Sequence, residues 1–242
     1  MKRLLNYLLC VALFVSCNSN ESSIPQVKFG GLNGNVLKLK ETHYTVTQKF
    51  GEMLPDEITQ ISINEFDKDG NSVQLGFYKE DGSFYYKIKT EWKDGKAITE
   101  THYSDNNEEP TITLSVAERS KNYVKWTVNP GKEDESFREQ FIDGLTVTSK
   151  NDKGEIETVL KYDKKGFVIE QKQITGSMAF RVVSELDDKG NPLKQIMYDE
   201  DGESSTRTYT YPDYDKKGNW ITQVITEDGT VEEIVKREIS YR

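Results

Sequence analysis

The sequence of 242 residues has little of several residue types on which common active sites depend, since it contains two cysteines, two histidines and six prolines. Its one long apolar run lies at the N-terminus, which excludes a polytopic membrane protein. Basic residues form no cluster, and 41 acidic against 32 basic residues give a formal charge of −9. This composition argues against nucleic-acid binding, because phosphates require basic partners. In contrast, 10 Phe, 13 Tyr and 3 Trp can anchor a core.

The N-terminal apolar run has the three parts of a secretory signal peptide. Lys2 and Arg3 precede it, and the small residue Ser16 stands directly before Cys17. The string Phe-Val-Ser-Cys that ends at Cys17 resembles a bacterial lipobox. This resemblance implies that residues 1–16 are a lipoprotein signal peptide and that Cys17 carries a lipid which holds the protein on a membrane. Ordinary cleavage that leaves Cys17 unmodified is the alternative.

Cleavage after Ser16 changes both the charge and the sulfur chemistry of the chain. The signal contains two basic residues and no acidic one, so the formal charge becomes −11. Cys10 is lost and an acylated Cys17 has no thiol, which excludes a disulfide, a thiolate nucleophile and a thiolate zinc site. Residues 17–30 are small and polar and predict a flexible tether. Asn18 after the cysteine favours the outer membrane, with the domain periplasmic or surface-exposed.

Glycine follows Asp or Glu at intervals of about a dozen residues along most of the chain. Gly70, Gly82 and Gly95 are 12 and 13 residues apart, and Gly190 and Gly202 are 12 apart. Aspartate can cap a tight turn, and glycine accepts the positive φ that such a turn needs. This spacing predicts roughly a dozen consecutive antiparallel strands.

Between the turns, side chains alternate with a period of two residues. In residues 84–92, aromatic, aliphatic or Thr side chains occupy the even positions, and charged ones occupy odd positions after Tyr85. Such alternation is typical of a strand with one buried face. We expect an all-β antiparallel meander of repeated hairpins, arranged as an extended sheet, an open barrel or a sandwich. The mature length argues against an enclosing shell.

An interruption divides the meander. Pro130-Gly131 and the acidic run after it predict a loop or linker over 130–144, between meanders at 31–129 and 145–242. A long surface loop within one sheet is the alternative to a domain boundary. A short helix over Lys132–Ile142 is also compatible with the sequence.

Three of the turns follow a longer pattern. Tyr162-Asp163-Lys-Lys-Gly166, Tyr198-Asp199-Glu-Asp-Gly202 and Tyr214-Asp215-Lys-Lys-Gly218 resemble the YD repeat of the Rhs family. Residues 34–51 are similar to the opening of Bacteroidetes lipoproteins that carry such repeats. The resemblance implies an antiparallel meander and, in larger members of the family, carbohydrate binding or an encapsulating shell.

Both histidines lie in the string Glu-Thr-His-Tyr, at Glu41–Tyr44 and Glu100–Tyr103. In a strand this spacing places the Glu and the His on one face and the Tyr on the other. If the two strands were neighbours, two Glu and two His would meet as a metal site. The alternative, which we favour, is a pair of equivalent repeat positions on the solvated face.

Other metal or catalytic motifs are weak. Asp67, Asp69 and Asn71 supply oxygens at alternate positions, as calcium loops do, but the glycine and the final glutamate of such a loop are misplaced. Hairpin capping explains these residues without a metal. No motif of a nucleophilic enzyme or a phosphate loop is present, so we expect neither catalysis nor a cofactor.

The aromatic residues are the most informative feature for function. Rings on a rigid sheet can stack on sugar rings or anchor a protein, although cross-strand pairing that covers the buried face is the interpretation that we favour for most of them. The candidate binding residues are Trp220, Tyr209, Tyr211, Tyr214 and Trp92. The sequence therefore favours a non-catalytic binding or scaffolding lipoprotein of the cell envelope that recognises a glycan or a protein. A polysaccharide hydrolase with an acidic pair and an inhibitor of a basic protein are the alternatives.

Overall fold

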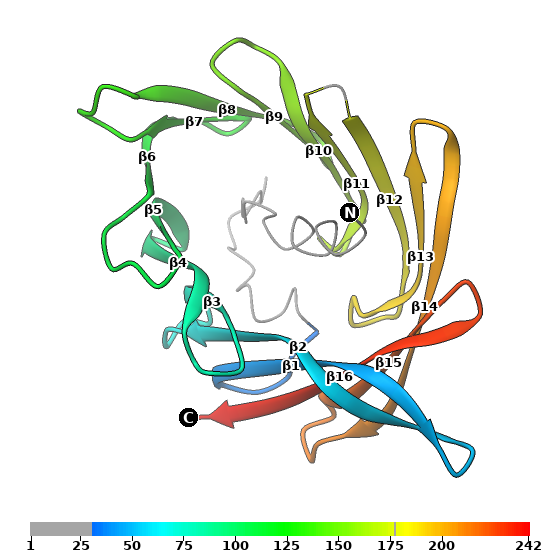
Figure 1. The fold of residues 1–242 in the computed structure, drawn as a ribbon. Coiled ribbons are helices and arrows are strands. Elements are labelled where there is room, and N and C mark those ends of the chain that lie inside the picture. The colour runs from blue at the N-terminus through cyan, green and yellow to red at the C-terminus, as the bar shows by residue number, and fades with distance from the viewer. Residues whose placement is uncertain (1–30, 177) are drawn as a thin grey trace.

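The computed structural model describes residues 31–176 and 178–242, and this part of the chain forms a closed barrel of sixteen antiparallel strands (Figure 1). Cys17, the signal peptide and the tether lie outside the described residues. In chain order the strands are β1 (Val36–Lys49), β2 (Glu52–Phe66), β3 (Ser72–Tyr78), β4 (Phe84–Lys93), β5 (Lys96–Ser104), β6 (Ile112–Arg119), β7 (Tyr123–Val128), β8 (Ser136–Asp143), β9 (Thr146–Lys150), β10 (Ile156–Tyr162), β11 (Val168–Thr175), β12 (Met178–Leu186), β13 (Pro192–Asp199), β14 (Gly202–Tyr214), β15 (Trp220–Glu227) and β16 (Thr230–Tyr241).

The predicted all-β meander is confirmed. Each strand pairs with the strand before it and the strand after it in the sequence, and β16 returns to pair with β1. At this junction, which we call the seam, Leu39 is opposite Ile239 and His43 is opposite Val235. In the part of the chain that the structure describes, closure leaves no strand of the wall with an unpaired edge, which removes the usual site of strand-to-strand association.

The aspartate turns cap the hairpins as their sequence predicts. In the turn after β12, Asp187 Oδ1 accepts hydrogen bonds from the backbone N–H groups of Lys189 and Asn191, each at 2.8 Å. Gly190 adopts a φ of +85°, which glycine accepts without strain. The same pattern of two backbone bonds to one carboxylate oxygen recurs at Asp67, Asp163 and Asp215.

A lysine in three of the aspartate turns, those that begin at Asp163, Asp187 and Asp215, reaches the next element along the rim. Lys165 Nζ lies 2.8 Å from Asp188 Oδ1 in the following turn. Lys189 Nζ donates to the Gly218 carbonyl at 2.9 Å, and Lys217 Nζ lies 3.9 Å from the centroid of the Tyr241 ring. The repeated lysine therefore links neighbouring hairpins, which gives the repeat motif a structural role.

The wall has two distinct faces that can be followed around the barrel by strand register. Directly opposed residues share a face, so Glu41 and His43 of β1 lie on the same side as Val235 and Arg237 of β16. This face holds most of the buried side chains, including those of Leu114, Val124, Trp126, Val147, Leu160 and Val182. Side chains crowd on the concave side of a closed sheet, so we call this set the inner face.

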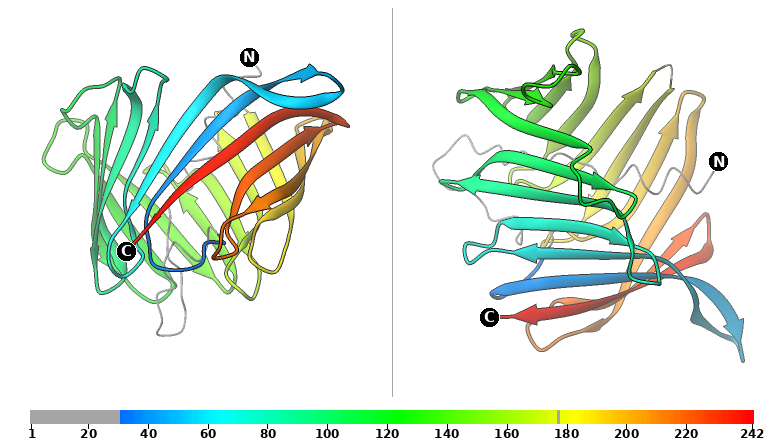
Figure 2. Two further views of the ribbon diagram at one scale, coloured as in Figure 1. Left: turned by 90° about the horizontal axis from the view of Figure 1, so that it is seen from below. Right: turned by 60° about the vertical axis from the view of Figure 1, so that its left-hand side comes forward.

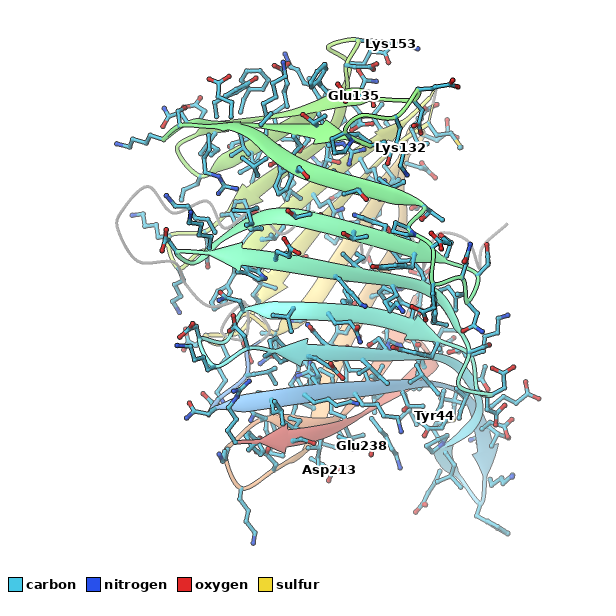
Figure 3. The ribbon with its side chains drawn as sticks, turned by 90° about the vertical axis from the view of Figure 1, so that its left-hand side faces the viewer. Tyr44, Lys132, Glu135, Lys153, Asp213 and Glu238 are labelled. Atoms are coloured by element: carbon cyan, nitrogen blue, oxygen red, sulfur yellow. The ribbon has the colours of Figure 1, made fainter. Side chains whose placement is uncertain are left out.

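The outer face carries many polar and charged side chains. Figure 3 shows oxygen- and nitrogen-tipped side chains along the wall, and it labels Tyr44 and Glu238, which belong to the outer set. The β1–β2 hairpin extends past its neighbours. Pairing of β1 with β16 ends at Tyr44, and pairing of β2 with β3 begins only at Ile61, so the hairpin between these residues pairs only with itself. Figure 2 shows this long hairpin projecting beyond the body of the barrel.

The segment 130–144, expected to be a loop or linker, contains a strand. Residues 136–143 form β8, which pairs with β7 and with β9, so the sheet continues through this part of the chain. The short helix considered for Lys132–Ile142 is wrong. Pairing with β7 along most of its length and with β9 from Glu139 onward supplies β8 with backbone partners, which outweighs the local turn signal at Pro130-Gly131.

Candidate functional site

Most of the aromatic residues singled out from the sequence lie on the inner face near the seam. Trp220 is only 5% exposed and packs with Tyr209, Ile225 and Val235. Its indole nitrogen donates to Asn191 Oδ1 at 3.1 Å, and the Arg237 guanidinium carbon lies 3.2 Å from the ring centroid. We call Tyr209, Tyr211, Trp220 and Arg237 the seam cluster. The Trp220 ring is covered by arginine rather than open to a ligand.

The other predicted binding residues are in different surroundings. The Tyr211 hydroxyl donates to the Pro192 carbonyl at 2.6 Å. Trp92 is half-buried, donates to the Ser72 carbonyl at 2.8 Å and packs beside the core cluster that contains Trp126. Tyr214 is 51% exposed. The five residues therefore do not form one contiguous exposed surface.

Two ion pairs cross the seam on the inner face. Arg237 Nε donates to Glu41 Oε1 at 2.8 Å, and His43 Nδ1 lies 2.6 Å from Glu233 Oε1. Ser62 of β2 extends the network, since its hydroxyl donates to Glu41 Oε2 at 3.3 Å. The Arg237 side chain is only 9% exposed, so water does little to stabilise its positive charge, and Glu41 across the seam supplies the compensating negative charge.

The ion pairs shift the ionisation of their members. Burial disfavours the charged form of Glu41, but Arg237 and His43 outweigh burial and hold the pKa of Glu41 below its ordinary value. Burial also disfavours protonated His43. The hydrogen bond and charge of Glu233 outweigh that effect and raise the pKa of His43 above its ordinary value.

The second Glu-Thr-His string lies in a different environment. β2, β3 and β4 separate β1 from β5, so the two strings do not meet and do not form the four-residue metal site considered from the sequence. Glu100 and His102 face the interior rather than the solvated side that we favoured. His102 hydrogen-bonds to the Tyr86 hydroxyl through Nδ1, and its Nε2 lies 3.7 Å from Glu100 Oε2.

The weak calcium candidates form a capped turn. Asp67 Oδ1 accepts from the backbone N–H groups of Asp69 and Asn71, each at 2.9 Å, and Asp67 Oδ2 accepts from the Asn71 amide at 3.0 Å. Among the described residues, no group of three or more His, Cys, Asp or Glu side chains is placed to hold a metal ion.

An exposed group of rings lies instead on the outer face of β7 and β8. Phe137 and Phe141 are each 39% exposed and share this face with Tyr123, which lies opposite Phe141. The Tyr123 and Phe141 ring centroids are 5.4 Å apart, and the Tyr123 hydroxyl donates to Glu139 Oε1 at 2.6 Å. We call Tyr123, Phe137 and Phe141 the outer aromatic patch.

Lysine and threonine side chains border the outer aromatic patch. Lys125 Nζ lies 4.1 Å from the Phe137 ring centroid, and Lys150 Nζ lies 5.0 Å from that of Phe141. Each phenylalanine also has a threonine directly opposite it, Thr127 for Phe137 and Thr148 for Phe141. The patch thus combines flat apolar surface with hydroxyl and ammonium groups.

Sequence reasoning missed this patch because it assigned 130–144 to a loop or linker. The signal was present in the alternation of Phe137, Glu139 and Phe141, which places three side chains on one face of a strand. The acidic residues before β8 obscured the start of that pattern.

Comparisons with known proteins give distant structural similarities. No family model and no curated protein sequence matches the chain. A porin-like protein from Bacteroides uniformis is similar over 85% of this chain and 96% of its own, at 12% identity and a TM-score of 0.47. A DUF1329 family protein from Desulfovibrio piger is similar over 85% of this chain and 86% of its own, at 9% identity and a TM-score of 0.27.

The structure was also inspected for helices that could cross a membrane. Within residues 31–176 and 178–242, no helix has the length and apolar character that this would require.

Proposed function

We propose that the protein is a non-catalytic binding module of the cell envelope, held on a membrane by lipid at Cys17, that binds a glycan through the outer aromatic patch. The observation that carries the proposal is the exposure of Phe137 and Phe141 on a paired strand. Two large rings held rigidly in contact with solvent are typical of recognition surfaces.

The surroundings of the rings favour a glycan over a protein ligand. Sugar rings present apolar C–H faces and hydroxyl edges, and the patch offers matching groups. The faces of Phe137 and Phe141 can take the sugar ring, while Thr127, Thr148 and Lys125 can hydrogen-bond to its hydroxyls. A protein hot spot more often consists of a desolvated apolar pocket.

The charged residues of the outer face indicate that this face is surrounded by water rather than by lipid. Lysines stand on the outer face in strands all around the wall. They include Lys40 of β1, Lys89 of β4, Lys125 of β7, Lys172 of β11, Lys194 of β13 and Lys236 of β16. Lipid disfavours charges at such positions, so this surface fits water, in which a polysaccharide can reach it.

Retardation in native gels that contain dissolved polysaccharides tests the proposal. A panel of neutral and acidic polysaccharides should include at least one that slows the wild-type chain. A Phe137→Ala, Phe141→Ala double variant should migrate freely in that gel. Phe50→Ala is the matched control, because Phe50 is a fully exposed ring at the tip of the β1–β2 hairpin. Equal retardation of the double variant and the wild type would contradict the proposal.

A further inference from the structure

The outer aromatic patch continues into a row of side chains that follows strand register across the wall. Tyr123 is opposite Phe141, which is opposite Thr148 of β9, and the row passes through Val159 of β10. It then includes Lys172 of β11, Arg181 of β12 and Tyr198 of β13. We call these seven residues the outer row.

The outer row contains two cations and no carboxylate, in a protein with an excess of acidic residues. Lys172 and Arg181 are opposite each other and exposed. The Arg181 guanidinium carbon lies 4.4 Å from the Tyr198 ring centroid. This stacking holds the arginine beside a flat ring and leaves its nitrogens to bind an anion.

Carboxylates beside the outer row are already engaged. Tyr123 donates to Glu139, and Lys161 Nζ lies 3.0 Å from Glu170 Oε2. Glu170 Oε1 is 3.9 Å from Arg181, a distance that leaves the guanidinium free to make a closer contact. The positive charge of Lys172 and Arg181 is therefore only partly offset by neighbouring residues.

From this arrangement we infer that the ligand is an acidic polysaccharide that lies across the strands along the outer row. The inference rests on the proposed function. Sugar rings stack on Phe141 and pass over Thr148 and Val159, whose side chains are small. Carboxylates of the same chain then meet Lys172 and Arg181. The distance from β8 to β12 is roughly 19 Å at about 4.8 Å per strand, and the wall curves, so a flexible chain of several sugars fits.

The test compares two polysaccharides with the same backbone, polygalacturonate and its methyl ester. The full chain is titrated with each, and a Lys172→Ala, Arg181→Ala variant is titrated in parallel. The expected result is binding of polygalacturonate but not of the ester, with about tenfold weaker affinity in the variant and a marked decrease with salt. A Lys93→Ala, Lys96→Ala variant is the control, since both lysines are exposed on another hairpin.

The outcomes separate this inference from the proposed function. If the ester binds as tightly as the acid, the acidic class is wrong while ring stacking survives. If neither polymer binds, the acidic class is also wrong, and the Phe137/Phe141 variant in the polysaccharide panel decides the proposed function independently. If the Lys93/Lys96 control weakens binding as much as the Lys172/Arg181 variant, the outer row is not the site.

Discussion

The seam cluster and the outer aromatic patch both bring rings and cations together, but on opposite faces of one wall. At the seam, Arg237 lies on Trp220 and both are buried, so the contact compensates a charge and fills space inside the barrel. In the outer patch, Lys125 lies near Phe137 and both remain accessible. A partly exposed lysine such as Lys125 can move away from a ring at little cost, whereas moving the buried Arg237 would leave a charge without its partner. The face of the strand therefore separates the buried rings, which stabilise the fold, from the exposed rings, which we propose to bind the ligand.

The largest expected effect is at the seam arginine. Arg237→Met should lower the free energy of unfolding by about 3–5 kcal/mol, because it leaves Glu41 without its cation and uncovers Trp220. Denaturant unfolding measures this change. Arg181→Met, which removes an exposed arginine from the outer row, is the control and should cost about 1 kcal/mol or less. Equal losses would show that the seam pair has no special role.

Removing a buried ring should likewise destabilise the fold more than removing an exposed one. Trp220→Ala is expected to cost about 3–5 kcal/mol, since it opens a cavity beside Tyr209 and Val235. Phe141→Ala should cost about 1 kcal/mol, because much of that ring already faces solvent. Thermal and denaturant unfolding of the two variants measure the difference. A Phe141 variant as unstable as the Trp220 variant would contradict the assignment of Phe141 to the binding surface.

The two Glu-Thr-His strings provide a smaller contrast within the inner face. Glu41→Gln should lower the free energy of unfolding by about 1.5–3 kcal/mol, because Arg237 loses a charged hydrogen-bond partner. Glu100→Gln should change it by less than about 1 kcal/mol, since the ion pair that the structure describes for Glu100 is a long one with His102. Unfolding in urea compares them. A larger loss of unfolding free energy for Glu100→Gln than for Glu41→Gln would contradict the special role of the Glu41–Arg237 pair.

The smallest effect concerns pH. His43 has a raised pKa, so its contribution to stability is complete below its ordinary pKa of 6.5 and is lost as pH rises through the folded value. Glu41 has a lowered pKa, so its contribution is present above 4.5 and is lost as pH falls through the folded value. From these two groups, stability should be greatest between about pH 4.5 and 6.5. Melting temperatures across pH should show that His43→Gln removes the alkaline decline, and an unchanged decline would exclude His43 as its source.

Much of the wall could be predicted from local sequence. Aspartate and glycine at fixed spacing specify the turns through the capping bonds seen at Asp67 and Asp187, and period-two alternation specifies the strands between them. Closure could not be predicted in this way, because the seam joins the first strand to the last. Whether these two strands meet depends on the register of every strand pair between them, which no local pattern specifies.

Which aromatic side chains are exposed could not be predicted from the sequence either, for a related physical reason. Alternation shows which side chains share a face of a strand, but it does not show which face is concave. Their aromatic character marks Trp220 and Tyr209 as candidates, yet both side chains are buried on the inner face. The register between β14 and β15 also shifts around Pro212, so alternation along β14 is interrupted there. Phe137 and Phe141 have the same alternation and face outward.

Hydroxyl-radical footprinting with and without polygalacturonate tests the central claim most directly, because one experiment reports both exposure and binding at individual side chains. Without polysaccharide, Phe137 and Phe141 should be oxidised faster than Trp220, although an indole is intrinsically at least as reactive as a phenyl ring. With polysaccharide, oxidation of Phe141 and Tyr123 should slow while that of Trp220 and Tyr209 stays unchanged. Protection at Trp220 with none at Phe141 would contradict the account.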